Sequence, residues 1–303
     1  MPVSGALLCL ASAFAFGTMA IFGKLAYDEG ATVGTLLAVR FALAAALCWM
    51  LVAGTGAARR LRAIGRRDLG IAFALGAVGY SAQAGGYFAA LERLDASLLS
   101  LLIYTFPAIV TVAAIALGRE RASRRSTAAL VLASAGLALV LVGAGAGTLD
   151  PLGTALGLGA AVVYAAYILT SQGVAARVGP LVLSALVCTG AAMTLTLGGA
   201  AAGELDLGGV STAGYGWLAA LAVVSTVGAV GLFFAGLRRV GPTAASILST
   251  AEPLVTVALA FLVFGESLRP AQLVGAALVL GAVLVLAARR AGTRAPVLAV
   301  ETA

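Results

Sequence analysis

The sequence contains no histidine and only three cysteines. Histidine is the commonest catalytic base and the commonest metal ligand, so its absence removes most metal centres and many hydrolytic mechanisms. Cys9, Cys48 and Cys188 lie inside apolar runs, at none of the spacings of zinc or redox motifs, which predicts small buried side chains. We therefore expect no metal site and no cofactor.

Charged residues are also scarce, at 10% of the chain, whereas 62% of the 303 residues are hydrophobic. A water-soluble domain needs a more polar surface, so the expected partner of most of this surface is the lipid bilayer. The apolar residues form blocks of about 20, which is the length of a helix that crosses a hydrocarbon core of about 30 Å. A β-barrel would instead show alternating segments of about 10 residues. The expected fold class is all-α integral membrane.

Hydropathy predicts ten transmembrane helices. The expected ranges are 4–23, 32–53, 69–90, 96–117, 127–145, 152–172, 180–200, 214–235, 243–263 and 271–288. The longest connection is too short for a folded extramembrane domain, so any functional site must lie among the helices.

The formal net charge of +7 arises in short loops rather than on a continuous basic face, so we expect no nucleic-acid partner. With the N-terminus in the cytoplasm, 15 of the 19 basic residues fall in cytoplasmic segments, three fall outside, and Arg40 lies within a span. Cytoplasmic loops carry an excess of Lys and Arg. This asymmetry predicts a multi-pass protein of the bacterial inner (plasma) membrane with both termini cytoplasmic.

The two parts of the chain align with each other. Residues 87–120 match residues 233–266 without a gap at an offset of 146, and Pro107 falls on Pro253. Repeats with an odd number of spans must cross the membrane in opposite senses, which is the plan of many secondary carriers. We therefore expect two inverted five-helix repeats. Their expected bounds are 1–146 and 147–290, followed by a cytoplasmic tail over 291–303.

Three segments carry a family resemblance. The stretch AEPLVTVALAFLVFGE resembles the ninth span of EamA-type members of the drug/metabolite transporter superfamily, VRFALAAAL resembles the second span, and ERLDASLLSLLIYTFPAIV the fourth. The likeness extends over nearly the whole chain. It implies ten helices, cytoplasmic termini, and export or exchange of metabolites through a cavity between the halves.

Glu252 is the first candidate for the functional site, because it lies near the middle of the ninth span, where an ionised carboxyl is costly unless it faces the bundle interior or water. Pro253 follows it and removes a backbone donor from the helix. The alternative is a structural role, in which Glu252 is protonated or bonded to Ser249 or Thr250 and joins helices.

Arg40 is the only basic residue deep in a span, and a guanidinium cannot lose its charge by deprotonation. It either pairs with a group such as Glu252 or extends towards the outer surface. Phenols and one amide could line a cavity that recognises a solute, although tyrosine is also common at membrane interfaces. These residues are Tyr80, Gln83, Tyr87, Tyr104, Tyr164 and Tyr167, among which Gln83, Tyr104 and Tyr164 lie away from span ends.

The leading functional hypothesis is a secondary carrier in which one half moves against the other around a midplane site, driven by a substrate or proton gradient. A lipid or lipid-linked sugar flippase of the same architecture is the alternative. An intramembrane enzyme is a remote third, because no nucleophile with a matching base is found at depth. The expected partners are a small-molecule solute such as an amino acid, protons, and a second copy of the chain joined through small residues of the fifth and tenth spans.

Overall fold

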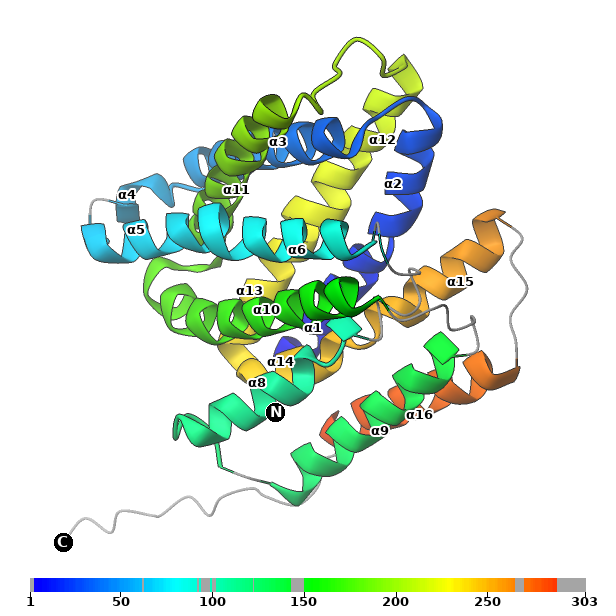
Figure 1. Cartoon of the computed structure of the whole chain (residues 1–303). Coiled ribbons are helices and arrows are strands. Elements are labelled where there is room, and N and C mark those ends of the chain that lie inside the picture. The colour runs from blue at the N-terminus through cyan, green and yellow to red at the C-terminus, as the bar shows by residue number, and fades with distance from the viewer. Residues whose placement is uncertain are drawn as a thin grey trace, which may run out of the picture.

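The structure is a computed structural model that describes residues 3–61, 63–91, 93, 99, 102–121, 123–142, 150–264 and 270–287. Within these residues all regular structure is helical (Figure 1). The helices are α1 (Val3–Gly17), α2 (Met19–Asp28), α3 (Val33–Gly54), α4 (Ala58–Leu61), α5 (Arg66–Ala74), η1 (Leu75–Tyr80), α6 (Ser81–Leu91), α8 (Phe106–Ala116), α9 (Arg124–Val142), α10 (Pro151–Val178), α11 (Pro180–Ala202), α12 (Thr212–Ala222), η2 (Val223–Gly228), α13 (Ala229–Val240), α14 (Pro242–Ser249), α15 (Glu252–Phe264) and α16 (Pro270–Ala287). The expected tail over 291–303 lies outside the described residues.

Five helical segments are long and apolar enough to cross a membrane, among the residues that the structure describes. They are Val3–Asp28, Val33–Gly54, Pro151–Val178, Pro180–Ala202 and Thr212–Val240. Apolar helices of this length and number make the chain an integral membrane protein. The expected count of ten spans remains a prediction, because the other predicted spans contain shorter apolar helices or run into residues outside the described ranges.

Capping residues define where several of these helices begin and end. The Asp150 carboxylate accepts a hydrogen bond from the Gly153 N–H at 2.6 Å, which caps the start of α10 beside Pro151. Gly179, with φ of 88°, ends α10 and leads directly into α11. The expected sixth span ended at 172, but α10 continues to Val178, because the positive φ that ends the helix comes only at Gly179.

Two long helical segments contain a π-helical turn. η1 lies between α5 and α6, and η2 lies between α12 and α13. In each case a hydroxyl donates to the carbonyl five residues back: Ser81 Oγ to Gly76 O at 3.1 Å, and Thr226 Oγ1 to Leu221 O at 3.0 Å. Such π-helical turns often accompany functional sites.

Two further helices are interrupted within apolar sequence. α1 and α2 are separated at Thr18, so the expected first span over 4–23 is two helices. α14 and α15 are separated at Thr250 and Ala251, one residue before the Glu252–Pro253 pair that predicted a break. A turn at Tyr104 and Thr105 likewise precedes α8.

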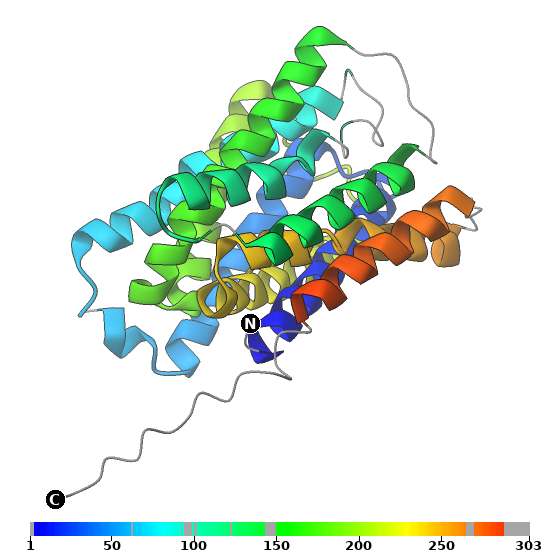
Figure 2. The same ribbon diagram turned by 90° about the horizontal axis from the view of Figure 1, so that it is seen from below.

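Helix pairs pack along one another in an arrangement that joins the two parts of the sequence. α3 packs on α11, α9 on α16, α1 on α13, α10 on α6, and α8 on α14. Figures 1 and 2 show α9 and α16 side by side at one edge of the molecule. At Gly136 of α9 an added Cβ would lie 2.6 Å from the Gly275 carbonyl oxygen of α16, so a glycine is needed for this close approach. The small residues expected to join two copies of the chain thus pack within one chain, and a homodimer remains a prediction.

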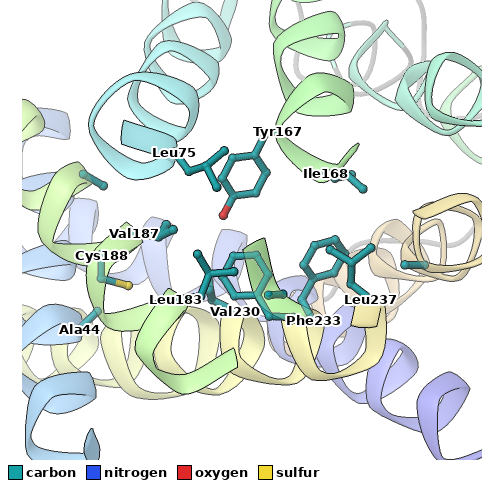
Figure 3. Packing of buried hydrophobic residues seen from close by; sticks show 14 of the residues in the cluster. Ala44, Leu75, Tyr167, Ile168, Leu183, Val187, Cys188, Val230, Phe233 and Leu237 are labelled. Carbon is teal, nitrogen blue, oxygen red and sulfur yellow. The ribbon is translucent and has the colours of Figure 1, made fainter. Parts of the chain in front are cut away.

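The buried core lies where η1, α10, α11 and α13 meet. Figure 3 shows Leu75, Tyr167, Val187 and Phe233 from these elements pointing towards one another. Many of the core residues are alanines, which allows the backbones of neighbouring helices to approach closely. Cys9, Cys48 and Cys188 are buried free thiols, as the sequence predicted.

Candidate functional site

Glu252 begins α15 immediately after the interruption of the ninth predicted span. Thr250 N and Ala251 N donate to the carbonyls of Ile247 and Leu248, each at 3.2 Å. The backbone hydrogen bonds at the end of α14 therefore join residues three apart, as in a 3₁₀ turn, instead of four apart. Pro253, the next residue, has no N–H to donate. The carboxyl group therefore lies at a helix N-terminus, where the partial positive charge of the backbone favours an anion.

The Glu252 carboxyl is hydrogen-bonded to the Tyr104 phenol and not to the neighbouring hydroxyls of Ser249 and Thr250. Thr250 Oγ1 donates to the Ile247 carbonyl at 2.6 Å, and Ser249 Oγ donates to the Ala245 carbonyl at 3.0 Å. Both hydroxyls thus bond within their own helix, which removes the proposed structural role in which they hold the carboxyl. Thr250 donates within α14 at the break, and its part in the site remains a prediction.

Three irregular segments meet beside Glu252. Thr256 Oγ1 of α15 donates to the Gly17 carbonyl at the end of α1, at 3.0 Å. Thr18, the next residue, shares a hydrogen bond of 2.7 Å with Ser225 Oγ of η2. The interruptions of α1–α2 and α14–α15 and the π-helical turn η2 are therefore neighbours in space. Backbone irregularity at membrane depth is tolerated where protein or water surrounds it.

Arg40 is buried in α3, with only 4% of its surface exposed, so it does not extend to the outer surface. Its Nε donates to Thr226 Oγ1 of η2 at 2.7 Å, and its guanidinium carbon lies 4.9 Å from the centre of the Phe41 ring. Its Nη2 is buried and has no hydrogen-bond partner among the described residues. One edge of the guanidinium is therefore fixed, while another donor is left unsatisfied.

Arg40 and Glu252 are near each other but not in contact. The two side chains interact electrostatically. Within the described part of the chain they do not form an ion pair, which is found only between Arg177 and Asp68. The phenol of Tyr80 interacts with both side chains and is hydrogen-bonded to Arg40. Arg40 and Glu252, the charged residues that the sequence placed within the spans, thus lie near each other without a direct contact.

Four tyrosines surround Glu252. Tyr80, Tyr87, Tyr104 and Tyr164 each lie close enough to interact electrostatically with its carboxyl group. All four, and Glu252 itself, are enclosed by the helices yet only partly buried.

Aromatic rings connect this group of tyrosines to the core. Phe106 lies between Tyr104 and Tyr164, with ring centres at 5.7 and 4.6 Å. Tyr167 lies between Tyr164 and Tyr80, with ring centres at 6.2 and 5.9 Å. These are favourable aromatic distances, so the rings form one packed wall around the carboxyl.

Gln83 lies on α6, four residues before Tyr87, and is partly buried. Residues at this spacing lie on the same face of a helix, so Gln83 shares the face of Tyr87. Sequence reasoning missed Thr226, which positions Arg40, and it missed Thr18 and Ser225 nearby. The available signal was the pair of hydroxyl residues, Ser225 and Thr226, within the apolar run ALAVVSTVGAV.

Each end of the molecule has a polar side-chain contact between residues that are far apart in the sequence. The Arg177 guanidinium of α10 binds the Asp68 carboxylate of α5, with Nη2 2.8 Å from Oδ1, and this hydrogen bonding lowers the pKa of Asp68. Both residues line a surface cavity of about 400 Å³ with Arg67 and Ile71. At the opposite end, Ser211 Oγ at the start of α12 donates to the carboxylate of Glu29 after α2.

Comparison with known proteins gives consistent results. Residues 3–142 and 151–288 each match the EamA-like transporter family. The chain is 28% identical over 280 residues to the uncharacterized transporter YcbK of Bacillus subtilis (strain 168), covering 90% of this chain and 89% of that protein. It is also 28% identical over 277 residues to an uncharacterized transporter of Archaeoglobus fulgidus, covering 90% of this chain and 93% of the other.

A solved crystal structure has the same fold, with a TM-score of 0.80 and 22% identity over 97% of this chain and 100% of that chain. The names of the family and of the relatives are those of transporters rather than enzymes. Two matches that together span most of the described helices leave one conclusion: the chain belongs to the EamA-like transporter family and is a membrane transporter.

Proposed function

We propose that this membrane transporter is a secondary carrier that exports or exchanges small metabolites such as amino acids by alternating access around the Glu252 site. The observation that carries the proposal is the nearness of Glu252 to Arg40 inside an apolar bundle, among partly buried tyrosines. Intramembrane ionisable residues usually mark a solute or ion pathway. Helices broken near the midplane, as α14–α15 is here, are typical binding sites of secondary carriers.

The carrier in this proposal has ten spans in two inverted five-helix repeats. Three observations support the repeat. The π-helical turns begin at Leu75 and Val223, close to the sequence offset of 146. The turns before α8 and α15 lie at Tyr104 and Thr250, at that offset. The packed pairs also map onto one another, because exchanging the halves converts α1–α13 into α10–α6 and leaves α3–α11 and α9–α16 unchanged.

The packing revises the expected motion. Most extensive contacts join helices from different halves, so the halves are interleaved. Moving one sequence half as a rigid body would break almost all of these contacts. Units that combine helices of both halves, such as α1 with α13 and α6 with α10, fit the packing better.

Proton coupling through Glu252 is part of the proposal, because a carboxyl at this depth can exchange its charge for a proton as the solute leaves. A Glu252→Gln variant should then lose the pH dependence of transport. Transport that stays pH-dependent in this variant would argue against coupling at Glu252.

Flux into liposomes tests the carrier itself. Purified protein is reconstituted and supplied with labelled amino acids, with Glu252→Gln and Arg40→Ala measured beside the wild type. Saturable flux that falls at least about tenfold in both variants is expected, because each removes one charged contact worth about 1.5–3 kcal/mol. Flux of a labelled lipid across the bilayer, without any solute flux, would favour the flippase instead.

A further inference from the structure

We infer that Glu120, in the turn between α8 and α9, is a positioning residue that holds α14 against α8 and thereby keeps Glu252 in contact with Tyr104. The inference deepens the proposed function and rests on it for the role of Glu252. It comes from the hydrogen bonds found at both ends of the α8–α14 pair.

α8 and α14 pack on each other and are joined at both ends (Figure 1). At one end, the Tyr104 phenol, just before α8, is hydrogen-bonded to the Glu252 carboxyl, just after α14. At the other end, Glu120 Oε1, just after α8, accepts a hydrogen bond from the Thr243 N–H in the first turn of α14, at 3.4 Å. The two helices therefore run antiparallel, with a carboxyl contact at each end.

The first turn of α14 depends on Glu120 because α14 has no capping side chain of its own. Its N-cap residue is Gly241, and the next residue, Pro242, has no N–H to donate. An added Cβ at Gly241 would lie 2.9 Å from Glu120 Oε1, so the carboxylate occupies the place of a capping side chain. The helix dipole favours an anion there, and Glu120 forms no ion pair within the described ranges that would draw it away.

The turn that carries Glu120 is itself held in place. Gly118 ends α8 with φ of 66°, which reverses the direction of the chain. The next residue, Arg119, donates from Nη1 to the Leu169 carbonyl of α10 at 2.6 Å. α10 also contributes Tyr164 to the aromatic wall of the site. The turn thus connects two of the helices that surround Glu252.

Backbone hydrogen bonds along α14 connect its first turn to Glu252. Thr250 N and Ala251 N donate to carbonyls three residues back, so the hydrogen bonding continues across the break as far as the residue before Glu252. The first turn lies about 14 Å from Glu252 at the rise of a helix. Release of this turn from Glu120 would therefore let α14 shift along α8 and move the Glu252 carboxyl away from Tyr104.

Backbone hydrogen exchange, read by mass spectrometry in detergent, tests the inference without any solute. Glu120→Ala should quicken exchange by about three- to tenfold in the first turn of α14 and also at Thr250 and Ala251, as expected for loss of a helix cap. Glu120→Gln keeps an acceptor oxygen and should give a smaller change. Arg121→Ala, at an exposed position of the same turn, is the matched control and should change neither region. Faster exchange confined to the first turn would make Glu120 a local cap only and overturn the inference.

A double-mutant cycle on solute flux in liposomes tests the role in transport. Glu120→Ala should lower flux by about three- to tenfold in the wild type but by less than about twofold in Tyr104→Phe, because the contact that Glu120 maintains is already lost there. Equal factors in both backgrounds, as independent sites would give, would overturn the inference while the carrier proposal stands. If no solute shows saturable flux, the carrier proposal fails, and the exchange experiment alone decides whether Glu120 holds α14.

Discussion

At the scale of single residues, Thr226 connects the fold to the site. Its hydroxyl accepts from Arg40 Nε and donates to the Leu221 carbonyl in the π-helical turn. The same atom therefore sustains an irregular backbone and orients a buried cation. A sequence pattern shows a hydroxyl in an apolar run, but it does not show which charged side chain of another helix that hydroxyl will meet.

A Thr226→Val substitution keeps the size and branching of the side chain while removing both hydrogen bonds. We expect a loss of about 1–3 kcal/mol in stability, since Arg40 Nε becomes unsatisfied, and slower solute flux. Thr226→Ser should preserve both properties. Thermal unfolding and flux into liposomes measure the two effects separately. Unchanged flux in the valine variant would show that Thr226 does not position Arg40 for transport.

At the scale of helices, the sequence predicted the break at Pro253 because proline lacks the N–H that a continuous helix needs. The break between α1 and α2 at Thr18 has no such local cause. Its hydroxyl bonds to Ser225 of η2, so the interruption depends on a contact with a distant helix. The same is true of η1 and η2, whose apolar segments read as ordinary helix. Tertiary contacts decided these features, and no local pattern encodes them.

The close approach of α9 and α16 can be tested at Gly136. A Gly136→Leu substitution should force the helices apart and reduce stability by about 1–3 kcal/mol, the usual effect of overpacking. Gly281 of α16 offers a matched control, because an added Cβ there meets nothing within 4 Å. Melting temperatures in detergent compare the two variants. Equal destabilisation by Gly136→Leu and Gly281→Leu would contradict the described packing.

The packing of α3 on α11 brings two native thiols together. Cys48 and Cys188 lie close enough to interact directly, whereas Cys9 of α1 contacts the region of Gly236. Oxidation with a membrane-permeant copper complex should therefore join Cys48 to Cys188 within one chain and leave Cys9 free. Mass spectrometry of peptides after alkylation identifies the linked pair. A disulfide that includes Cys9 would show that the helices are arranged differently.

At the scale of the molecule, the proposed inverted plan would place corresponding contacts at opposite ends. The sequence predicted the repeats from the offset of 146 and the orientation from the basic loops. It did not predict that the halves interleave, because alignment of a chain with itself contains no information on which helices pack together. Figure 1 shows the start of α5 and the α2–α12 region at opposite ends of the molecule. Asp68 binds Arg177 at the first end, and Glu29 binds Ser211 at the second.

These end contacts lie at the ends of the packed pairs α6–α10 and α1–α13, so each should hold its own end of the bundle closed. An Asp68→Asn variant should open the end near Ile71, which lines the surface cavity beside the ion pair. In a background without native cysteines, labelling of Ile71→Cys should quicken by about two- to fivefold, a modest change because the pair is exposed. Glu29→Gln, at the opposite end, is the matched control and should not quicken it.

The pH dependence of this labelling follows from the lowered pKa of Asp68. A carboxyl whose folded pKa is lowered stabilises the closed contact above its unfolded pKa, and this stabilisation is lost as the pH falls through the folded pKa. Labelling of Ile71→Cys in the wild-type contact should therefore stay slow as the pH falls into the usual titration range of aspartate, and quicken only below it. In Asp68→Asn the rate, corrected for the ionisation of the thiol, should not depend on pH in this way. If labelling quickens already at mildly acidic pH, or equally in both proteins, the Asp68–Arg177 pair does not close this end.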